Sequence, residues 1–381
     1  MTTLHRDYET RSACDLRTSG VHKYAEDPST EVLCMSYAVD DGPVKMWRWG
    51  EPCPPEFIEC AKNPEWLAMA HNSQFEQTME RYLLSKRYGW PVIPRERERC
   101  TMVMAHAMSI AASLENAAAA TGLEVRKDTE GRKLMMKMAQ PRRVTAPGEK
   151  TYDADLALAK SDKRIATLLP GGEVAVWWYT AEMMDRLCEY CATDTKVERA
   201  LEKRLMTLIP SEWDFWVLDQ EINDRGIFVD LPAIDNALKI VELEKARLDK
   251  EMLFTTNGAV RTCSQAAALL AWLTGQGVPM EAVAKGDVLA ALALPGLPEV
   301  ARKALMLRQE AAKSSTAKLK AMRLGASSNG RVKGTAQFHG ASTGRFAGRR
   351  LQPQNFPRPS ILTDKKSIAI GEVMDMLGDE A

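Results

Sequence analysis

Short runs of apolar residues alternate with turn residues over the first 80 positions, which predicts strands and helices in a mixed order. The first strand carries acidic residues on one face, and the hairpin after it turns at Asp41-Gly42. These elements are expected at residues 3–11 (strand), 31–48 (hairpin), just after Pro54-Pro55 (helix), 66–72 (strand) and from about Gln74 (helix). Such an order is typical of the α/β class, a mixed sheet with flanking helices.

Helical patterns dominate the remainder of the chain. Residues 100–140 are rich in Met and Ala, and their methionine stripe is expected to pack in the core. A domain boundary is expected at Ile209-Pro210-Ser211, and residues 325–359, rich in Gly, Ser and Arg, are expected to form loops and strands. The other expected elements are a helix at about 180–208, a helix ending near Asn223, a short strand at 227–230, a helix at 232–252, short helices within 256–296 and a basic amphipathic helix at 297–323. Two long helices with short ones between them predict a bundle-like arm.

The length of 381 residues predicts two or three domains, each large enough for a core of its own. The sequence has no apolar run of about 18 residues that could cross a bilayer, and no signal-peptide pattern at its start. We therefore expect a cytosolic protein without a membrane partner. The eight cysteines fit this compartment, since the Cys188–Cys191 pair lacks the second pair of a zinc site. A redox or metal role for the cysteines is the alternative.

The net charge is zero, but the charge is unevenly distributed. Residues 302–366 contain 15 lysines and arginines against two acids, Glu310 and Asp364, which gives this segment a charge of +13. The rest of the chain must then carry −13. A basic segment in a neutral protein indicates a polyanionic partner at that end. For residues 302–323 a solvated basic helix face is an equally good interpretation.

Four acids and a tyrosine occur in three short motifs, DYE, NSQFE and YCATD. Asp7 and Glu9 are two positions apart on a predicted strand, so both side chains point to one face. Tyr190 and Asp194 are four apart on a predicted helix and also share a face. Glu76 lies at the start of another helix. Each motif alone has little specificity, because such pairs arise by chance in many proteins.

Acids that converge on one place repel one another unless cations neutralise them. Mg²⁺ and Mn²⁺ favour carboxylate and water ligands, so two such ions are the expected cofactors. Two ions about 3.5–4 Å apart can activate a water and stabilise the attacking and leaving oxygens of a phosphodiester. The combination therefore predicts two-metal phosphodiester hydrolysis.

The order and spacing of the motifs, with Asn72 and Phe75 beside Glu76, resemble the 3′–5′ exonuclease (proofreading) superfamily. Within it, the chain resembles the exonuclease domain of phage family A, DNA polymerase I-like, enzymes. The resemblance implies a ribonuclease H-like fold, and Asn72 and Phe75 as supporting residues that contact DNA. The family most often has Asp where this chain has Glu76. The extra methylene moves the carboxylate by about 1.5 Å, which a contact through water can absorb; a degenerate fold kept for structure is the alternative.

The resemblance also implies a role for each member of the site. Asp7 would bridge both metal ions, and Glu9 and Asp194 would complete the tighter metal site. Glu76 would help to hold the second ion, often through water. Tyr190 would orient the attacking water.

Residues 331–359 resemble the TGR…LQN segment with which family A polymerases grip the primer–template duplex. Here the segment reads Thr343-Gly344-Arg345 and then Gln354-Asn355-Phe356-Pro357. Arginines can contact phosphates, and amides can contact sugar and base acceptors. The expected DNA contacts are Arg345, Arg349, Arg350, Gln352, Gln354 and Asn355. A generic basic loop is the alternative.

The resemblance implies three domains. They are an exonuclease domain (1–208), a helical thumb-like DNA-binding region (209–330) and the start of a polymerase palm-like segment with a basic loop and tail (331–381). The family's remaining palm and fingers motifs do not appear after Pro359. The chain alone is therefore expected not to polymerise, and is either a fragment or one half of a split polymerase whose other chain carries palm and fingers.

Three functions are compatible with these motifs. The first is a 3′–5′ exodeoxyribonuclease that acts on single-stranded 3′ ends and binds primer–template duplex, in the cytoplasm of an infected bacterial host. The second is a catalytically inert exonuclease fold that holds DNA for a separate polymerase chain. An RNA-processing exonuclease is disfavoured, because the TGR…LQN segment is typical of polymerases.

Overall fold

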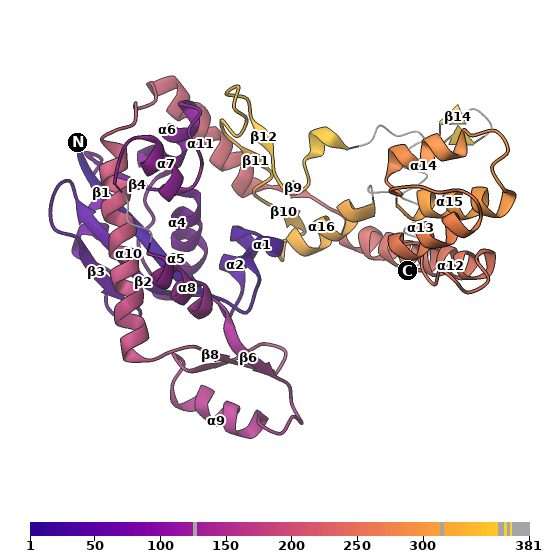
Figure 1. The fold of residues 1–381 in the computed structure, drawn as a ribbon. Helices are drawn as coiled ribbons and strands as arrows, with labels where there is room; N and C mark the ends of the chain where they lie inside the picture. Colours follow the sequence, from indigo (N-terminus) through magenta and orange to yellow (C-terminus); the bar gives the residue numbers. More distant parts are fainter. Residues whose placement is uncertain (125–127, 313–315, 357–361, 364–365, 368–381) are drawn as a thin grey trace. The chain divides into compact units, whose positions relative to one another are not determined.

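The computed structural model describes all residues except 125–127, 313–315, 357–361, 364–365 and 368–381. The chain forms two compact units (Figure 1). The first consists of Met1–Phe228 with Gly325–Gln354, and the second of Val229–Leu324 with Asn355–Ala381. Most of the predicted tail after residue 356 lies outside the described residues. The division into three functional domains stays a prediction.

A five-stranded mixed sheet forms the centre of the first unit. Its order is β3-β2-β1-β4-β5, in which β2 is antiparallel to both neighbours and β4 is parallel to β1 and β5. The strands are β1 (Thr2–Arg11), β2 (Glu31–Val39), β3 (Lys45–Arg48), β4 (Trp66–Ala70) and β5 (Glu98–Cys100). The predicted strand, hairpin and following strand are confirmed, and with them the α/β class.

Helices surround this sheet, and the predicted helices after Pro54-Pro55, from Gln74 and within 100–140 are confirmed. They are α1 (Leu16–Ser19), α2 (Val21–Glu26), α3 (Pro55–Lys62), α4 (Gln74–Met79), the π-helix η1 (Glu80–Leu84), α5 (Ser85–Tyr88), the 3₁₀-helix η2 (Arg95–Arg97), α6 (Thr101–Ala107), α7 (Leu114–Ala120), α8 (Thr129–Met138), α10 (Ala181–Glu202) and α11 (Pro210–Arg225). The predicted helix at 180–208 is α10, which ends at Glu202 rather than at 208.

Helix α10 packs along β1 and β2 (Figure 1). The hydroxyl of Thr180 caps its start by accepting a hydrogen bond from the backbone N–H of Met183. Along its length, His5 Nδ1 lies 2.8 Å from a Glu198 carboxylate oxygen, and Ser36 Oγ donates to the Cys191 carbonyl at 2.7 Å. These buried polar contacts fix the rotation of the helix over the sheet.

A buried ion-pair network ties β1 to η1 and to β5. Arg6 is 1% exposed, and its Nε donates to Glu80 at 2.6 Å. Its Nη2 donates to both carboxylate oxygens of Glu98, at 2.8 and 2.9 Å. Tyr8 also donates to Glu80, at 3.0 Å. The face of β1 opposite Asp7 and Glu9 is therefore held by charge as well as by apolar packing.

A small second sheet, which was not predicted, lies between α8 and α10 in the chain (Figure 1). It has the order β6-β8-β7, and α9 packs against it. Its elements are β6 (Pro141–Thr145), α9 (Tyr152–Ser161), β7 (Ala166–Leu168) and β8 (Val174–Trp177). The buried Asp155 pairs with Arg143 and accepts from the Thr145 hydroxyl, which joins α9 to β6.

The segment Gly325–Gln354 belongs to the first unit. Its strand β10 (Arg331–Val332) pairs with β9 (Ile227–Phe228), and β11 (Ala336–Gln337) pairs with β12 (Ala347–Gly348). Asn223 of α11 makes two hydrogen bonds to the backbone of Ala336, at 2.9 and 3.0 Å. A short 3₁₀-helix, η4 (Pro353–Asn355), follows. The described residues of 325–359 confirm the predicted loops and short strands.

The second unit is mainly helical. It contains α12 (Leu231–Thr255), α13 (Ala266–Gly275), α14 (Lys285–Leu292), α15 (Glu299–Ala311), α16 (Ala317–Gly325) and the short pair β13 (Leu362–Thr363) and β14 (Lys366–Ser367). The predicted helices at 232–252 and within 256–296 are confirmed. The predicted single helix at 297–323 is wrong: the described residues form two helices, and residues 313–315 between them are not described. Leucines of α12, α13 and α15 share one buried core.

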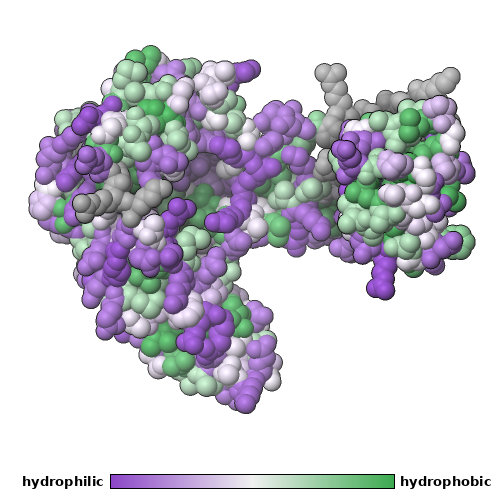
Figure 2. Space-filling view, viewed as in Figure 1, coloured by the Kyte–Doolittle hydropathy of each residue, from purple (hydrophilic) through white to green (hydrophobic). Residues whose placement is uncertain are grey.

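Hydrophilic and hydrophobic residues are interspersed on the face of each unit that Figure 2 shows, as is usual for globular units. Within the described part of the chain, every helix is too short or too polar to cross a membrane.

Candidate active site

Strand β1 and helices α4 and α10 bring together the acids that the sequence singled out. Asp7 and Glu9 lie on one face of β1, and the pairing of β1 with β2 is irregular between Glu9 and Thr10. Such irregularities often lie beside active sites, where they redirect a side chain. Glu76 lies in the first turn of α4, and Asp194 lies on α10, which packs over β1.

Burial and mutual repulsion raise the pKa of the acids. Desolvation followed by the charge of Asp194 raises the pKa of Asp7 well above its usual value. Desolvation followed by the charges of Asp7, Asp194 and Glu76 does the same for the pKa of Glu9. Burial, and then Asp7, also raise the pKa of Glu76. The four groups therefore interact, and a bound cation would relieve their repulsion.

Asp194 and Tyr190 are less deeply buried. Desolvation raises the pKa of Asp194 to about 6, and its hydrogen bond with Tyr190 opposes this rise. Desolvation and the charge of Asp194 raise the pKa of the Tyr190 phenol, so Tyr190 remains protonated and can donate a hydrogen bond. The predicted pairing of these two residues on one helix face is thus present in the structure.

The carboxylate oxygens of the cluster fit a hard divalent cation. Asp7, Glu9 and Cys191 each offer a ligand atom, and these three atoms lie within 4.8 Å of one another. Glu76 is only 3% exposed, and its Oε2 has no hydrogen-bond partner among the described residues. An unsatisfied buried carboxylate oxygen is costly. Since carboxylate oxygens are the ligands that Mg²⁺ and Mn²⁺ favour, the residues present suit these ions.

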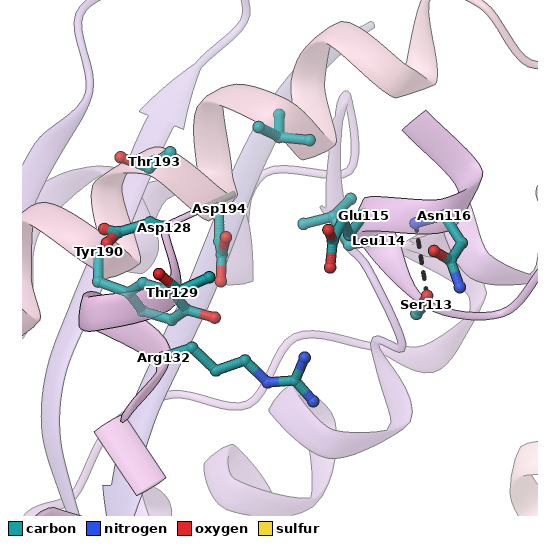
Figure 3. A pocket seen from close by; sticks show the side chains of 11 residues that line it. Ser113, Leu114, Glu115, Asn116, Asp128, Thr129, Arg132, Tyr190, Thr193 and Asp194 are labelled. Atoms are coloured by element: carbon teal, nitrogen blue, oxygen red, sulfur yellow. Dashed lines mark hydrogen bonds between the residues drawn. The ribbon is translucent and has the colours of Figure 1, made fainter. Parts of the chain in front are cut away.

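A pocket of about 570 Å³ lies beside Tyr190 and Asp194. Figure 3 shows Asp194 and Tyr190 of α10 facing Glu115 of α7 across it, with Arg132 of α8 reaching into the space between them. The other lining residues are Ser113, Leu114, Asn116, Asp128, Thr129, Thr193 and Val197. Asp194 therefore belongs both to the acid cluster and to the pocket wall.

Helix α8 approaches Tyr190 closely because residue 131 is glycine. A Cβ at Gly131 would lie 2.6 Å from Cδ2 of Tyr190 and 2.5 Å from a carboxylate oxygen of Asp128. Asp128 caps α8 by accepting from the N–H of Gly131 at 2.8 Å, and it also pairs with Arg186 of α10. Glycine at position 131 therefore allows α8 to pack closely against α10, and both helices line the pocket.

Several pocket residues lie outside the motifs and were not predicted from the sequence. Chief among them are Asp128, Arg132 and Glu115. They occur in ordinary helical patterns, and only the packing of α7 and α8 against α10 brings them to the site. The Asp128 cap, three residues before Gly131, was the one local signal that could have been read.

The supporting residues of the second motif lie in the turn after β4 and in the first turn of α4. Asn72 is exposed and has a positive φ of 70°, a conformation that asparagine tolerates better than most residues. Its carbonyl accepts from the N–H of Phe75 at 2.8 Å, which opens the turn into α4. Phe75 packs against the core of the first unit. Contact of either residue with DNA stays a prediction.

The three predicted DNA-binding arginines have different surroundings. Arg345 is exposed, and its Nε donates to the Thr343 hydroxyl at 3.0 Å. Arg349 is exposed at the rim of a second pocket, of about 250 Å³, which Asn72 also lines. Arg350 donates to the Ser19 carbonyl at 2.6 Å and is partly buried, so in this structure it anchors the segment to the first unit. DNA contact by these arginines stays a prediction.

The predicted amide contacts lie just beyond β12. Gln354 packs against Gly348. A Cβ at position 348 would lie 1.9 Å from Nε2 of Gln354, so a larger residue there would displace the Gln354 side chain. Gln352 has a positive φ of 46°, and Asn355 ends η4. Their contact with DNA is likewise a prediction.

No protein-family model matches the chain. A curated protein does: the DNA polymerase of Bacillus phage SP02 is 33% identical over 366 residues. The chain is a homologue of this phage DNA polymerase. The match includes 95% of this chain and 52% of the phage polymerase, so the chain spans about half the length of the relative. The predicted resemblance to a phage DNA polymerase is thereby confirmed.

A solved structure agrees at the level of the fold. The polymerase domain of Pol1 from M. smegmatis, determined in complex with DNA primer-template and dNTP, has a TM-score of 0.51 and 12% identity. The likeness covers 93% of this chain and 53% of the Pol1 chain. At this identity it concerns the fold alone.

Proposed function

We propose that the chain is a metal-dependent 3′–5′ exonuclease of the proofreading type, which hydrolyses terminal phosphodiesters of DNA. The observation that carries the proposal is the cluster of acids formed by the buried Glu9 and Glu76 and the half-buried Asp7 and Asp194, each with a raised pKa. Without cations, the burial and mutual repulsion of these carboxylates cost free energy that nothing in the cluster offsets. Homology to a phage DNA polymerase supports DNA as the substrate.

Some residues of the site would bind the ions, and others would orient the reactants. Asp7, Glu9 and Asp194 would hold two divalent ions, Mg²⁺ or Mn²⁺, with Glu76 supporting the second. Such ions, when bound, stabilise the attacking and leaving oxygens of a phosphodiester. Tyr190 keeps its proton because its pKa is raised, so its hydroxyl can donate a hydrogen bond at the site and orient water.

The pocket beside Asp194 would receive the 3′-terminal nucleotide. Its volume of about 570 Å³ suits one nucleotide better than a helical duplex. Arg132 reaches into it and is the lining residue that can neutralise a phosphate (Figure 3). A single-stranded or frayed 3′ end is therefore the proposed substrate.

If the chain is an exonuclease of this type, its first unit has a ribonuclease H-like fold. The mixed sheet, with the acids on its central strand β1, supports this proposal. We also propose that residues 331–356 bind primer–template duplex, and that the helical second unit acts as a thumb-like arm. Their support is the homology along 95% of the chain. Two further statements stay predictions: that the protein acts in the cytoplasm of an infected host, and that a partner chain supplies palm and fingers.

Product analysis tests the activity. Single-stranded DNA would be incubated with the protein and Mg²⁺, and the products separated by chromatography. The proposal predicts deoxynucleoside 5′-monophosphates, and none when EDTA is present. Short oligonucleotides as the first products would indicate an endonuclease and contradict it.

Divalent ions should stabilise the protein through the acid cluster. At an ion concentration of about 100 times Kd, a single site adds about 2.7 kcal/mol to the free energy of unfolding. Mg²⁺ or Mn²⁺ should therefore raise Tm in a thermal melt, and the increase should largely disappear in Glu9→Gln. An equal increase in that variant would place the ions elsewhere.

Arg345→Ala should weaken duplex binding at low salt and reduce the slope of log K against log salt by about 0.9, the contribution of one phosphate contact. Fluorescence anisotropy with a labelled primer–template at several salt concentrations measures this slope. Arg204→Ala, which removes an exposed arginine after α10, is the matched control and should leave the slope unchanged. Equal slopes for wild type and Arg345→Ala would remove Arg345 from the interface.

The second candidate function is an inert exonuclease fold that holds DNA for a polymerase chain. It stays a candidate because this chain has Glu76 where the family most often has Asp. Duplex binding with ion-induced stabilisation but no cleavage would favour this alternative. Glu76→Asp would then show whether the longer side chain is the cause.

A further inference from the structure

A thiol lies inside the acid cluster. Cys191 is fully buried on α10, directly after Tyr190, and its Sγ lies 3.4 Å from Oδ2 of Asp7. The Sγ also lies 3.2 Å from the hydroxyl of Ser36. Among the described residues, Asp7, Glu9 and Cys191 are the group of potential metal ligands whose atoms all lie within 4.8 Å of one another. The sequence predicts a reduced cysteine at this position.

A second observation also points to a ligand at this place. Glu76 is 3% exposed, Oε2 of Glu76 has no hydrogen-bond partner among the described residues, and its charge acts on Glu9. A buried carboxylate oxygen without a donor is costly, and a cation bound nearby would offset that cost.

We propose that Cys191 is a metal ligand, and that Asp7, Glu9 and Cys191 together bind a thiophilic divalent cation such as Zn²⁺ or Cd²⁺. The inference rests on the same carboxylates as the proposed function, but it concerns ion binding and not cleavage.

The chemistry of the donor set favours this class of ion. Mg²⁺ takes oxygen ligands and gains little from sulfur, whereas thiolate selects softer ions such as Zn²⁺. Two carboxylates and one thiolate leave the fourth position of a tetrahedral Zn²⁺ site open, for Glu76 or for water. Because the thiolate is the form that binds, coordination releases the Cys191 proton to solvent. Zn²⁺ or Cd²⁺ should then compete with Mg²⁺ for Asp7 and Glu9.

Cadmium titration tests the site, because Cd²⁺–thiolate bonds give an ultraviolet charge-transfer band. The protein would carry serine at the partly exposed Cys14 and Cys53, so that these thiols do not contribute. We expect one Cd²⁺ per chain with this band, and an apparent Kd that increases when Mg²⁺ is added. Cys191→Ser should abolish the band, and Glu9→Gln should weaken Cd²⁺ binding at least tenfold. Circular dichroism would confirm that each variant is folded, and Cys191→Ala replaces Cys191→Ser if the latter is not.

Cys188→Ala is the matched control, since Cys188 is also buried on α10 and, like Cys191, lies near Cys34. The band should persist in this variant. A band that survives Cys191→Ser, or no band in the starting protein, would overturn the inference. So would a band that is lost in Cys188→Ala but unchanged in Glu9→Gln, since the ion would then sit among the thiols alone. Cd²⁺ binding as expected, in a protein that cleaves no DNA, would leave this inference standing and refute the proposed function.

Discussion

Asp7→Asn should reduce cleavage of single-stranded DNA by about a thousandfold or more, since bound ions stabilise the transition state by several kcal/mol and each 1.36 kcal/mol is about tenfold in rate. The charge of Asp7 acts on both Glu9 and Glu76, so its removal changes the charge of the whole acid cluster. Initial rates with labelled oligonucleotide and saturating Mg²⁺ measure the loss.

The same substitution should not unfold the protein. Without ions, replacing Asp7 by a neutral isostere relieves its repulsion with Asp194, so Tm in EDTA should equal or exceed that of the wild type. Asp153→Asn, on the exposed side of α9, is the matched control and should cleave normally. Cleavage by Asp7→Asn within tenfold of wild type would place the metal site elsewhere.

Arg6→Met should destabilise the first unit by about 3–5 kcal/mol, because it leaves two buried carboxylates without their cation. Arg6 is held by Glu80 and by both oxygens of Glu98, and all three side chains are almost fully buried. Denaturant unfolding with a probe in the first unit measures the change. Lys133→Met, which breaks an exposed pair with Glu130, is the control and should have little effect.

The pH dependence of Arg6→Met has a definite sign. Glu98 already has a pKa of about 7, raised chiefly by burial and partly offset by Arg6, so loss of Arg6 should raise it further. A carboxyl that binds its proton more tightly in the folded state than in the unfolded state loses stability as pH rises above its unfolded pKa. The variant should therefore be more stable at pH 5.5 than at pH 8. Equal destabilisation at both, or a loss below 1 kcal/mol, would show that Arg6 does not hold these charges.

Local patterns predicted much of the fold. The alternation in β1 placed Asp7 and Glu9 on one face, the Asp41-Gly42 turn gave the hairpin, and the spacing in α10 placed Tyr190 beside Asp194. Each of these depends on residues close together in sequence. The α/β class follows from them, because strand and helix periods differ enough to be distinguished.

Features that depend on distant partners could not be predicted in this way. The burial of Arg6 depends on partners that lie 74 and 92 residues away, which no local pattern reveals. The sheet of residues 141–177 consists of strands of three to five residues, too short for a clear alternation. The contact of Cys191 with Asp7 exists only once α10 packs on β1, so the sequence around Cys191 does not reveal it.

Cleavage of a 5′-labelled single-stranded oligonucleotide tests directly whether the acid cluster hydrolyses DNA from its 3′ end. The protein would be incubated with Mg²⁺ or Mn²⁺, with EDTA and Asp7→Asn as the two controls. We expect a ladder of labelled products that shortens progressively from the 3′ end and is absent in both controls. Intact oligonucleotide with either metal, from a protein that still binds duplex DNA, would contradict the proposed activity.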